Sequence, residues 1–83
     1  MFRTTAEFDS AMGEILKQLS EGKDLSEISY SESEDDHNAA IVECIDKGYI
    51  SGVTYFYTQD GKAHFSVINL RVTYNGLSFI ESI

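Results

Sequence analysis

Residues 31–52 read "SESEDDHNAAIVECIDKGYISG", a pattern typical of a helix that ends sharply and continues as a strand. Ser33 is a favourable N-cap, and the positive end of the helix dipole stabilises the carboxylates of the first turn. Gly48, which follows Lys47, is suited to end the helix. The apolar repeat predicts one buried face, which holds His37, Ala40, Ile41, Cys44 and Ile45.

A longer helix is predicted over residues 4–23, "TTAEFDSAMGEILKQLSEGK". Thr4 and Glu7 have the spacing of a capping box, and Gly22 is suited to the left-handed residue that ends a helix. Gly13 lowers helix stability by about 1 kcal/mol relative to alanine, so we expect another backbone to pack close to it. The apolar face of this helix consists of Phe8, Met12, Ile15, Leu16 and Leu19.

Two short helical elements complete the helical part of the chain. Between the two longer helices, Leu25 and Ile28 predict a single helical turn with Asp24 as its cap. At the end of the chain, residues 72–83 predict a short helix that Thr73 caps. The packing positions of that helix are Gly76, where space is tight, and Leu77, Phe79 and Ile80.

Residues 49–70 predict a β-hairpin. Asp60-Gly61 is a strong signal for a two-residue type I′ turn, in which both central residues have positive φ. Both faces of the hairpin are partly apolar, and only one of them can cover the core. Pairing outward from the turn places Thr58 opposite Ala63, Phe56 opposite Phe65 and Thr54 opposite Val67. The other face then holds Val53, Tyr55, Tyr57, His64, Ser66 and Ile68.

The length and charge of the chain bound its class. Its 83 residues suit one small domain, which we expect to span residues 1–83. The 14 acidic and 6 basic residues give a formal charge of -8, which repels nucleic acid and anionic lipid and favours a basic protein partner. No apolar stretch approaches the roughly 20 residues of a membrane span, and the N-terminus lacks the pattern of a signal peptide. We therefore expect a cytoplasmic location, to which the single cysteine is suited.

The predicted order of helix, short turn, helix, hairpin and short helix is that of a winged-helix domain, an α+β fold. Three stretches sharpen this likeness: "IDKGYISGV" (45–53) resembles a helix–wing junction, "TQDGKAH" (58–64) a wing tip, and "LRVTYNGLSFIE" (70–81) the element that follows the wing in many small bacterial winged-helix proteins. Together they resemble the YjcQ type, a family of small bacterial and prophage-borne proteins. The resemblance implies a winged-helix fold over nearly the whole chain.

No combination of residues predicts catalysis, a cofactor or a metal site. Serines are plentiful, but none lies in a Gly-x-Ser-x-Gly turn, and no glycine-rich phosphate loop occurs. His37 and Cys44 are seven positions apart on one helix, hence about 10.5 Å along its axis, too far to share one zinc ion. Residues 32–36 lack the alternating pattern and glycine of a calcium loop. We expect a protein that is not an enzyme.

One functional hypothesis is a DNA-binding regulator, by analogy with other winged-helix domains. The helix over residues 34–47 would enter the major groove, where Asn38 could read adenine. Lys62 and Arg71 would contact phosphates, and two such contacts are few unless a dimer doubles them. The residues expected on the outside of this helix are Asp35, Asn38, Ala39, Val42, Glu43 and Asp46.

The second hypothesis is a protein-interaction module on the same fold, and we prefer it because its charge argument comes directly from the residues. The acidic side chains of Asp35, Asp36 and Glu43 would face a basic partner, such as a DNA-binding protein. Apolar contacts would come from the hairpin face with Val53, Tyr55 and Tyr57, which could equally pair two copies of the chain. The structural alternative is that the acids cap and solvate the helix and the tyrosines cover the last helix.

Overall fold

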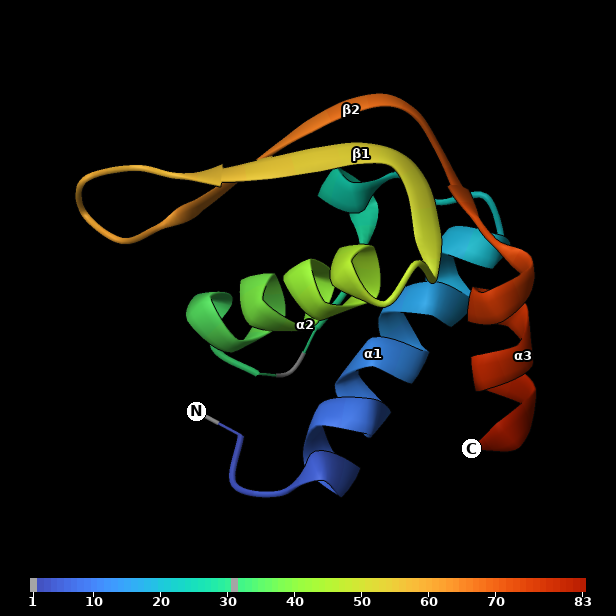
Figure 1. Cartoon of the computed structure of the whole chain (residues 1–83). Coiled ribbons are helices and arrows are strands. Elements are labelled where there is room, and N and C mark those ends of the chain that lie inside the picture. Colours follow the sequence, from blue (N-terminus) through green and yellow to red (C-terminus); the bar gives the residue numbers. More distant parts are fainter. Residues whose placement is uncertain (1, 31) are drawn as a thin grey trace.

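Residues 2–30 and 32–83, which the computed structural model describes, form three α-helices, one short 3-10 helix and a two-stranded antiparallel hairpin (Figure 1). This arrangement confirms the predicted α+β class and the predicted order of elements. In chain order the elements are α1 (Thr5–Ser20), η1 (Leu25–Glu27), α2 (Glu34–Asp46), β1 (Ile50–Tyr57), β2 (Ala63–Val72) and α3 (Tyr74–Ser82).

Side-chain caps fix where each α-helix begins. The hydroxyl of Thr4 accepts a hydrogen bond from the N–H of Glu7 at 3.1 Å. The Glu7 carboxylate accepts from the N–H of Arg3 at 2.8 Å, so the predicted reciprocal bond forms one residue before the N-cap. Ser33 caps α2 and Thr73 caps α3 through the same kind of hydroxyl contact, as their positions in the sequence predict.

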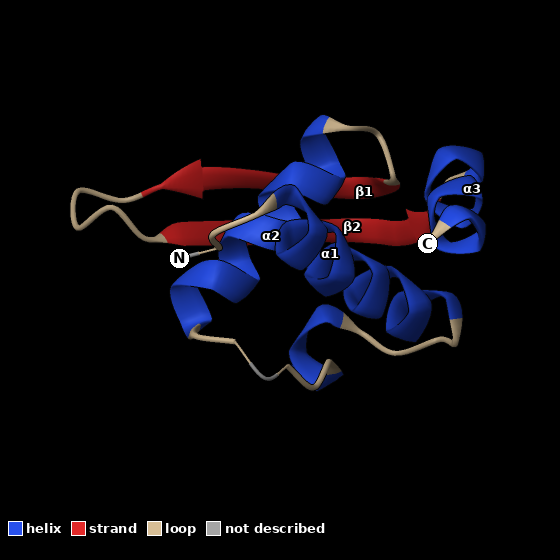
Figure 2. Cartoon of the chain, turned by 90° about the horizontal axis from the view of Figure 1, so that it is seen from below, coloured by secondary structure: helices blue, strands red, loops and turns tan. Residues whose placement is uncertain are grey.

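The core lies between the two long helices and one face of the hairpin, and Figure 2 shows both helices in front of that face. Ile45 is half-buried rather than buried. Val42, which we expected on the outside of α2, is only 8% exposed, because β1 lies over this part of the helix (Figure 1). The buried apolar side chains that pack together are Ala11, Met12, Ile15, Leu16, Leu19, Ile28, Ala40, Ile41, Cys44, Ile50 and Val53.

The turn of the hairpin differs from the predicted type I′ turn. The N–H of Gly61 donates to the carbonyl of Thr58 at 2.9 Å, and the N–H of Thr58 donates to the carbonyl of Lys62 at 3.1 Å. Gly61 has a φ of 81°, whereas Asp60 has no positive φ. These contacts define a type I turn followed by a left-handed glycine, which leaves three residues in the loop instead of two.

The longer loop shifts the strand register by one residue, so the predicted pairing of Phe56 with Phe65 is wrong. A slip of one residue exchanges the two faces of a strand. It is β1 whose faces are exchanged relative to the prediction: Val53 turns toward the helices and Phe56 turns toward solvent, while Phe65 of β2 packs against the core as predicted. The observed partners are Val53 and Val67, Thr54 and Ser66, Tyr55 and Phe65, Phe56 and His64, and Tyr57 and Ala63.

The start of α3 is fixed to the connection between α2 and β1. The hydroxyl of Thr73 donates to the carbonyl of Gly48 at 2.5 Å and accepts from the N–H of Gly76 at 3.2 Å. A Cβ at Gly76 would lie 2.3 Å from the carbonyl oxygen of Tyr49, so only glycine fits this close backbone approach. The prediction that space is tight at this position is confirmed.

Two packing predictions for the helices need correction. The group next to Gly13 is the side chain of Ile83 rather than a backbone, because α3 runs alongside α1 (Figure 1). Leu77 is 47% exposed and does not pack against the core, whereas Phe79 and Ile80 do.

Candidate protein-interaction surface

The outward face of the hairpin carries apolar side chains that no other element covers. Phe56 is 56% exposed and Ile68 is 88% exposed. The ring of Phe56 stacks on His64 of the paired strand, with 5.4 Å between the ring centroids and 17° between their planes. We call Phe56, His64 and Ile68 the outer wing face. Sequence reasoning placed His64 and Ile68 on an outward face, but it assigned Phe56 to the core because it assumed a two-residue turn. The stretch "TQDGK" also fits a three-residue loop that ends in a left-handed glycine.

The three hairpin residues predicted to meet a partner differ in exposure in the observed register. Val53 is 7% exposed and belongs to the core, so the expectation that it lies on an exposed interface is wrong. Tyr55 is half-buried, and Tyr57 is 59% exposed near the wing tip. The two tyrosine rings meet edge to face at 5.7 Å. Only Tyr57 of these three is freely accessible.

Tyr55 fixes the hairpin to the C-terminal end of α2. Its hydroxyl donates to the carboxylate of Asp46 at 2.9 Å. This hydrogen bond raises the pKa of the Tyr55 phenol, because the bond and the negative charge of Asp46 both disfavour the phenolate. The contact holds β1 over α2 and helps to cover Val42.

The exposed side chains of α2 are all acidic: they are Glu34, Asp35 and Asp46. Asp36 and Glu43 are half-buried, and the N–H of Asp36 donates to the capping hydroxyl of Ser33 at 3.2 Å. The remaining positions of α2 are buried or half-buried, because the helix lies between α1 and the hairpin (Figures 1 and 2).

The three residues predicted to contact DNA do not come together on one surface. Asn38 is half-buried in a shallow cleft of about 350 Å³ that separates α2 from the wing tip. Lys62 borders the same cleft, close to Asp35 and Asp60. Arg71 is exposed at the opposite end of β2. At about 3.3 Å per residue, Lys62 and Arg71 are up to about 30 Å apart along the strand.

Cys44 and His37 are core side chains, as the position of each on the apolar face of α2 predicts. Burial, and then the charge of Glu43, raise the pKa of the Cys44 thiol to about 12, so the thiol stays protonated. Among the described residues, no three His, Cys, Asp or Glu side chains gather closely enough to hold a metal ion. None of the described helices has the length and apolar character of a membrane span.

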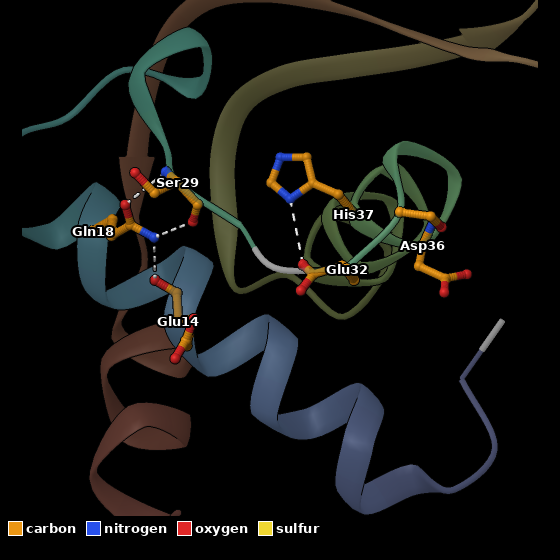
Figure 3. Close-up of polar contacts among 7 residues, drawn as sticks. Glu14, Gln18, Ser29, Glu32, Asp36 and His37 are labelled. Atoms are coloured by element: carbon orange, nitrogen blue, oxygen red, sulfur yellow. Dashed lines mark hydrogen bonds and ion pairs between the residues drawn. The ribbon is translucent and has the colours of Figure 1, made fainter.

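His37 is 5% exposed and has an incomplete set of polar contacts. Its ring stacks on Tyr30 with the centroids 3.8 Å apart. Its Nδ1 lies 3.6 Å from the carboxylate of Glu32 and has no hydrogen-bond partner (Figure 3). Burial lowers the pKa of His37, and the Glu32 carboxylate opposes this effect only in part. The imidazole is therefore mostly neutral near pH 7.

Gln18 holds the segment before α2 in place, a role that the sequence did not indicate. Its amide nitrogen donates to the carbonyl of Ser29 at 2.9 Å, and its amide oxygen accepts from the N–H of Ser29 at 2.9 Å (Figure 3). The side chain thus imitates a neighbouring strand and fixes residues 28–30 beside α1.

A groove of about 920 Å³ lies between β2 and the connection formed by residues 22–26. Its hairpin wall consists of residues from β2 and the wing tip, among them Lys62, Phe65 and Val67. Its other lining residues include Leu19, Ile28, His37 and Ile41 from the core side. We call this space the β2 groove.

The fold and these surfaces define a small α+β domain with an acidic helix beneath an exposed apolar hairpin. The chain belongs to the YjcQ protein family, whose family model matches residues 7–82. The predicted resemblance is therefore confirmed over nearly the whole chain. Neither the curated proteins nor the solved structures that we compared include a match.

Proposed function

We propose that this chain is a non-enzymatic regulatory module of winged-helix type that acts through a protein partner or through self-association. The observation that carries the proposal is the nature of α2, whose exposed side chains are Glu34, Asp35 and Asp46. A recognition helix meets base edges and phosphates with exposed donors and cations. This helix offers carboxylates, which phosphates repel.

The outer wing face supports a protein partner. Phe56 and Ile68 are large apolar side chains that remain in contact with water. The stack between Phe56 and His64 fixes the relative orientation of these two side chains. Interface cores are enriched in aromatic and apolar side chains that exclude water, with charged groups at the rim. The charge of -8 would direct a partner with basic residues to this domain.

DNA binding has weaker support from the positions of the cations. Lys62 and Arg71 lie toward opposite ends of β2. Two phosphate contacts would give a slope of only about -1.8 in a plot of log affinity against log salt concentration. Asp60, next to Lys62, accepts hydrogen bonds from the Thr58 hydroxyl and the N–H of Lys62. The Thr58 contact is the main cause that lowers the pKa of Asp60, so the wing tip also carries a firm negative charge.

The first experiment titrates random duplex DNA into the protein at low ionic strength, with fluorescence anisotropy as the signal. We expect no binding. The variant Glu34→Gln/Asp35→Asn should gain weak, salt-sensitive binding if α2 faces DNA as in other winged-helix domains. Micromolar binding by the unmodified protein that weakens steeply with salt would establish the DNA-binding regulator instead.

The second experiment compares association by variants at three exposed apolar or aromatic positions. Phe56→Ser and Ile68→Ser should abolish self-association in light scattering, or the stoichiometric capture of a partner from native extract. Tyr74→Ser is the matched control, because Tyr74 is 85% exposed on α3, away from the outer wing face. If neither self-association nor capture depends on Phe56 or Ile68, the outer wing face does not serve this function.

A further inference from the structure

The outer edge of β2 is unpaired along the wall of the β2 groove. Thr58 and Lys62 form the hydrogen-bonded pair that closes the hairpin. Hydrogen-bonded and non-hydrogen-bonded pairs alternate along an antiparallel ladder. His64 and Ser66 therefore direct their N–H and C=O groups toward β1, whereas residues 63, 65 and 67 direct theirs outward, away from β1.

These outward groups find no partner in the described part of the chain. In residues 2–30 and 32–83, no backbone hydrogen bond from another element reaches residues 63–67. The regular ladder extends as far as the pair of Val53 and Val67, where a register shift interrupts it. This edge is thus a short, regular row of free donors and acceptors, which is a template for another strand.

The apolar side chains next to this edge are incompletely covered. Val67 lies opposite the buried Val53, on the face of the hairpin that turns toward the helices, yet it is 52% exposed. Phe65, on the same face, is half-buried. Both line the β2 groove together with Ile28 and Ile41. The floor beside the free edge is therefore apolar, and Val67 and Phe65 are its accessible part.

The size of the groove matches one added strand. A strand takes up roughly 160 Å³ per residue, from a rise of about 3.3 Å, a strand spacing of about 4.8 Å and a sheet spacing of about 10 Å. The 920 Å³ of the groove thus has room for about six residues. Residues 22–26 form the opposite wall, so the groove is bounded on both sides and suits a single extended segment.

We propose that the β2 groove binds an extended segment of a basic partner protein as a third strand on β2. Main-chain hydrogen bonds to Phe65 and Val67 would fix the segment, and its alternate apolar side chains would lie on the groove floor. Asp24 and Glu34 on the walls are balanced by Lys23 and Lys62, so the preference for a basic segment comes from the charge of -8 of the whole chain. The proposal rests on the proposed protein-interaction function and assigns it a second site, which borders the outer wing face at His64 but does not include Phe56 or Ile68.

The test uses a capped peptide that alternates lysine and valine, observed by amide NMR and hydrogen exchange. In the free protein, the amides of Phe65 and Val67 should exchange faster than those of His64 and Ser66. The peptide should protect the amides of Phe65 and Val67 from exchange and shift their resonances. A peptide that alternates aspartate and valine, and a lysine–valine peptide with N-methylated backbone amides, are the controls that should bind at least tenfold more weakly.

Two variants at one position test the geometry. Val67→Pro removes an outward N–H without removing a hydrogen bond to β1. If the proline variant fails to fold, Val67→Lys takes its place, since it adds a positive charge that repels the lysine–valine peptide. Both variants should lower the affinity for the lysine–valine peptide at least tenfold, whereas Ile68→Ser should leave this affinity unchanged. Absence of peptide binding, or equal binding of either control peptide, would overturn the proposal. Partner capture that depends on Ile68 would survive that result, so the two proposals can fail separately.

Discussion

The corrected hairpin register can be tested by removing matched apolar side chains from its two faces. With the predicted type I′ turn, Val53 and Ile68 lie on the same outward face, so truncation of either should have a similar and small effect. In the structure Val53 is 7% exposed and Ile68 is 88% exposed. The variants Val53→Ala and Ile68→Ala therefore distinguish the two registers.

The expected loss of stability for Val53→Ala follows from burial. Removal of two buried carbon atoms costs about 1.6 kcal/mol in transfer free energy, and the residual cavity raises the loss to about 2 kcal/mol. For a domain of 60 to 100 residues this corresponds to a decrease of about 10 °C in Tm. Ile68→Ala changes an exposed position and should stay within about 0.5 kcal/mol.

Urea denaturation followed by circular dichroism measures both free energies of unfolding. Because both substitutions lower intrinsic β-propensity by comparable amounts, the difference between the variants reports burial rather than strand propensity. Equal losses for the two variants, or a larger loss for Ile68→Ala, would refute the register and with it the assignment of the outer wing face.

Three further predictions follow from the core. Cys44→Ala should lower the free energy of unfolding by about 1 to 2 kcal/mol. The thiol of the folded protein should resist alkylation at pH 8, because burial raises its pKa to about 12, and rapid labelling of the native protein would contradict this burial. Burial lowers the pKa of His37 below its usual 6.5, so the unfolded state binds a proton first and the free energy of unfolding falls as pH decreases through 6.5. Urea denaturation at several pH values should show that His37→Phe loses this dependence, whereas the exposed control His64→Phe keeps it. Gly76→Ala should cost about 1 to 3 kcal/mol in chemical denaturation, since the new Cβ would displace α3 from the carbonyl of residue 49, and an unchanged midpoint would mean that α3 does not dock there.

The local elements could be predicted from the sequence because their signals are themselves local. Hydroxyl caps at Thr4, Ser33 and Thr73 precede apolar repeats, and glycines follow two of the helices, so the helix boundaries depend on hydrogen bonds between near neighbours in the chain. The identity of the buried faces of α1 and α2 follows from the helical period. The family resemblance rests on the same ordered stretches.

The faces of the hairpin were decided by tertiary structure. Both faces contain aromatic and aliphatic residues, so the pattern alone admits two registers, and one extra loop residue exchanges the faces. The helices select the register that buries Val53 and leaves Phe56 in solvent. For this reason the exposed apolar surface combines Ile68, which was predicted to face outward, with Phe56, which was predicted to face the core.

The accessibility of α2 was likewise set by long-range packing. The helical period separates an apolar stripe from a polar one, but it does not say that a hairpin will cover the polar stripe. The hydrogen bond from Tyr55 to Asp46 and the burial of Val42 place β1 over α2, so the side chains left exposed on this helix are acidic. The sequence determined the charge of the domain, and the packing of the hairpin determined which of those charges a partner can meet, because exposure depends on contacts between residues distant in the chain.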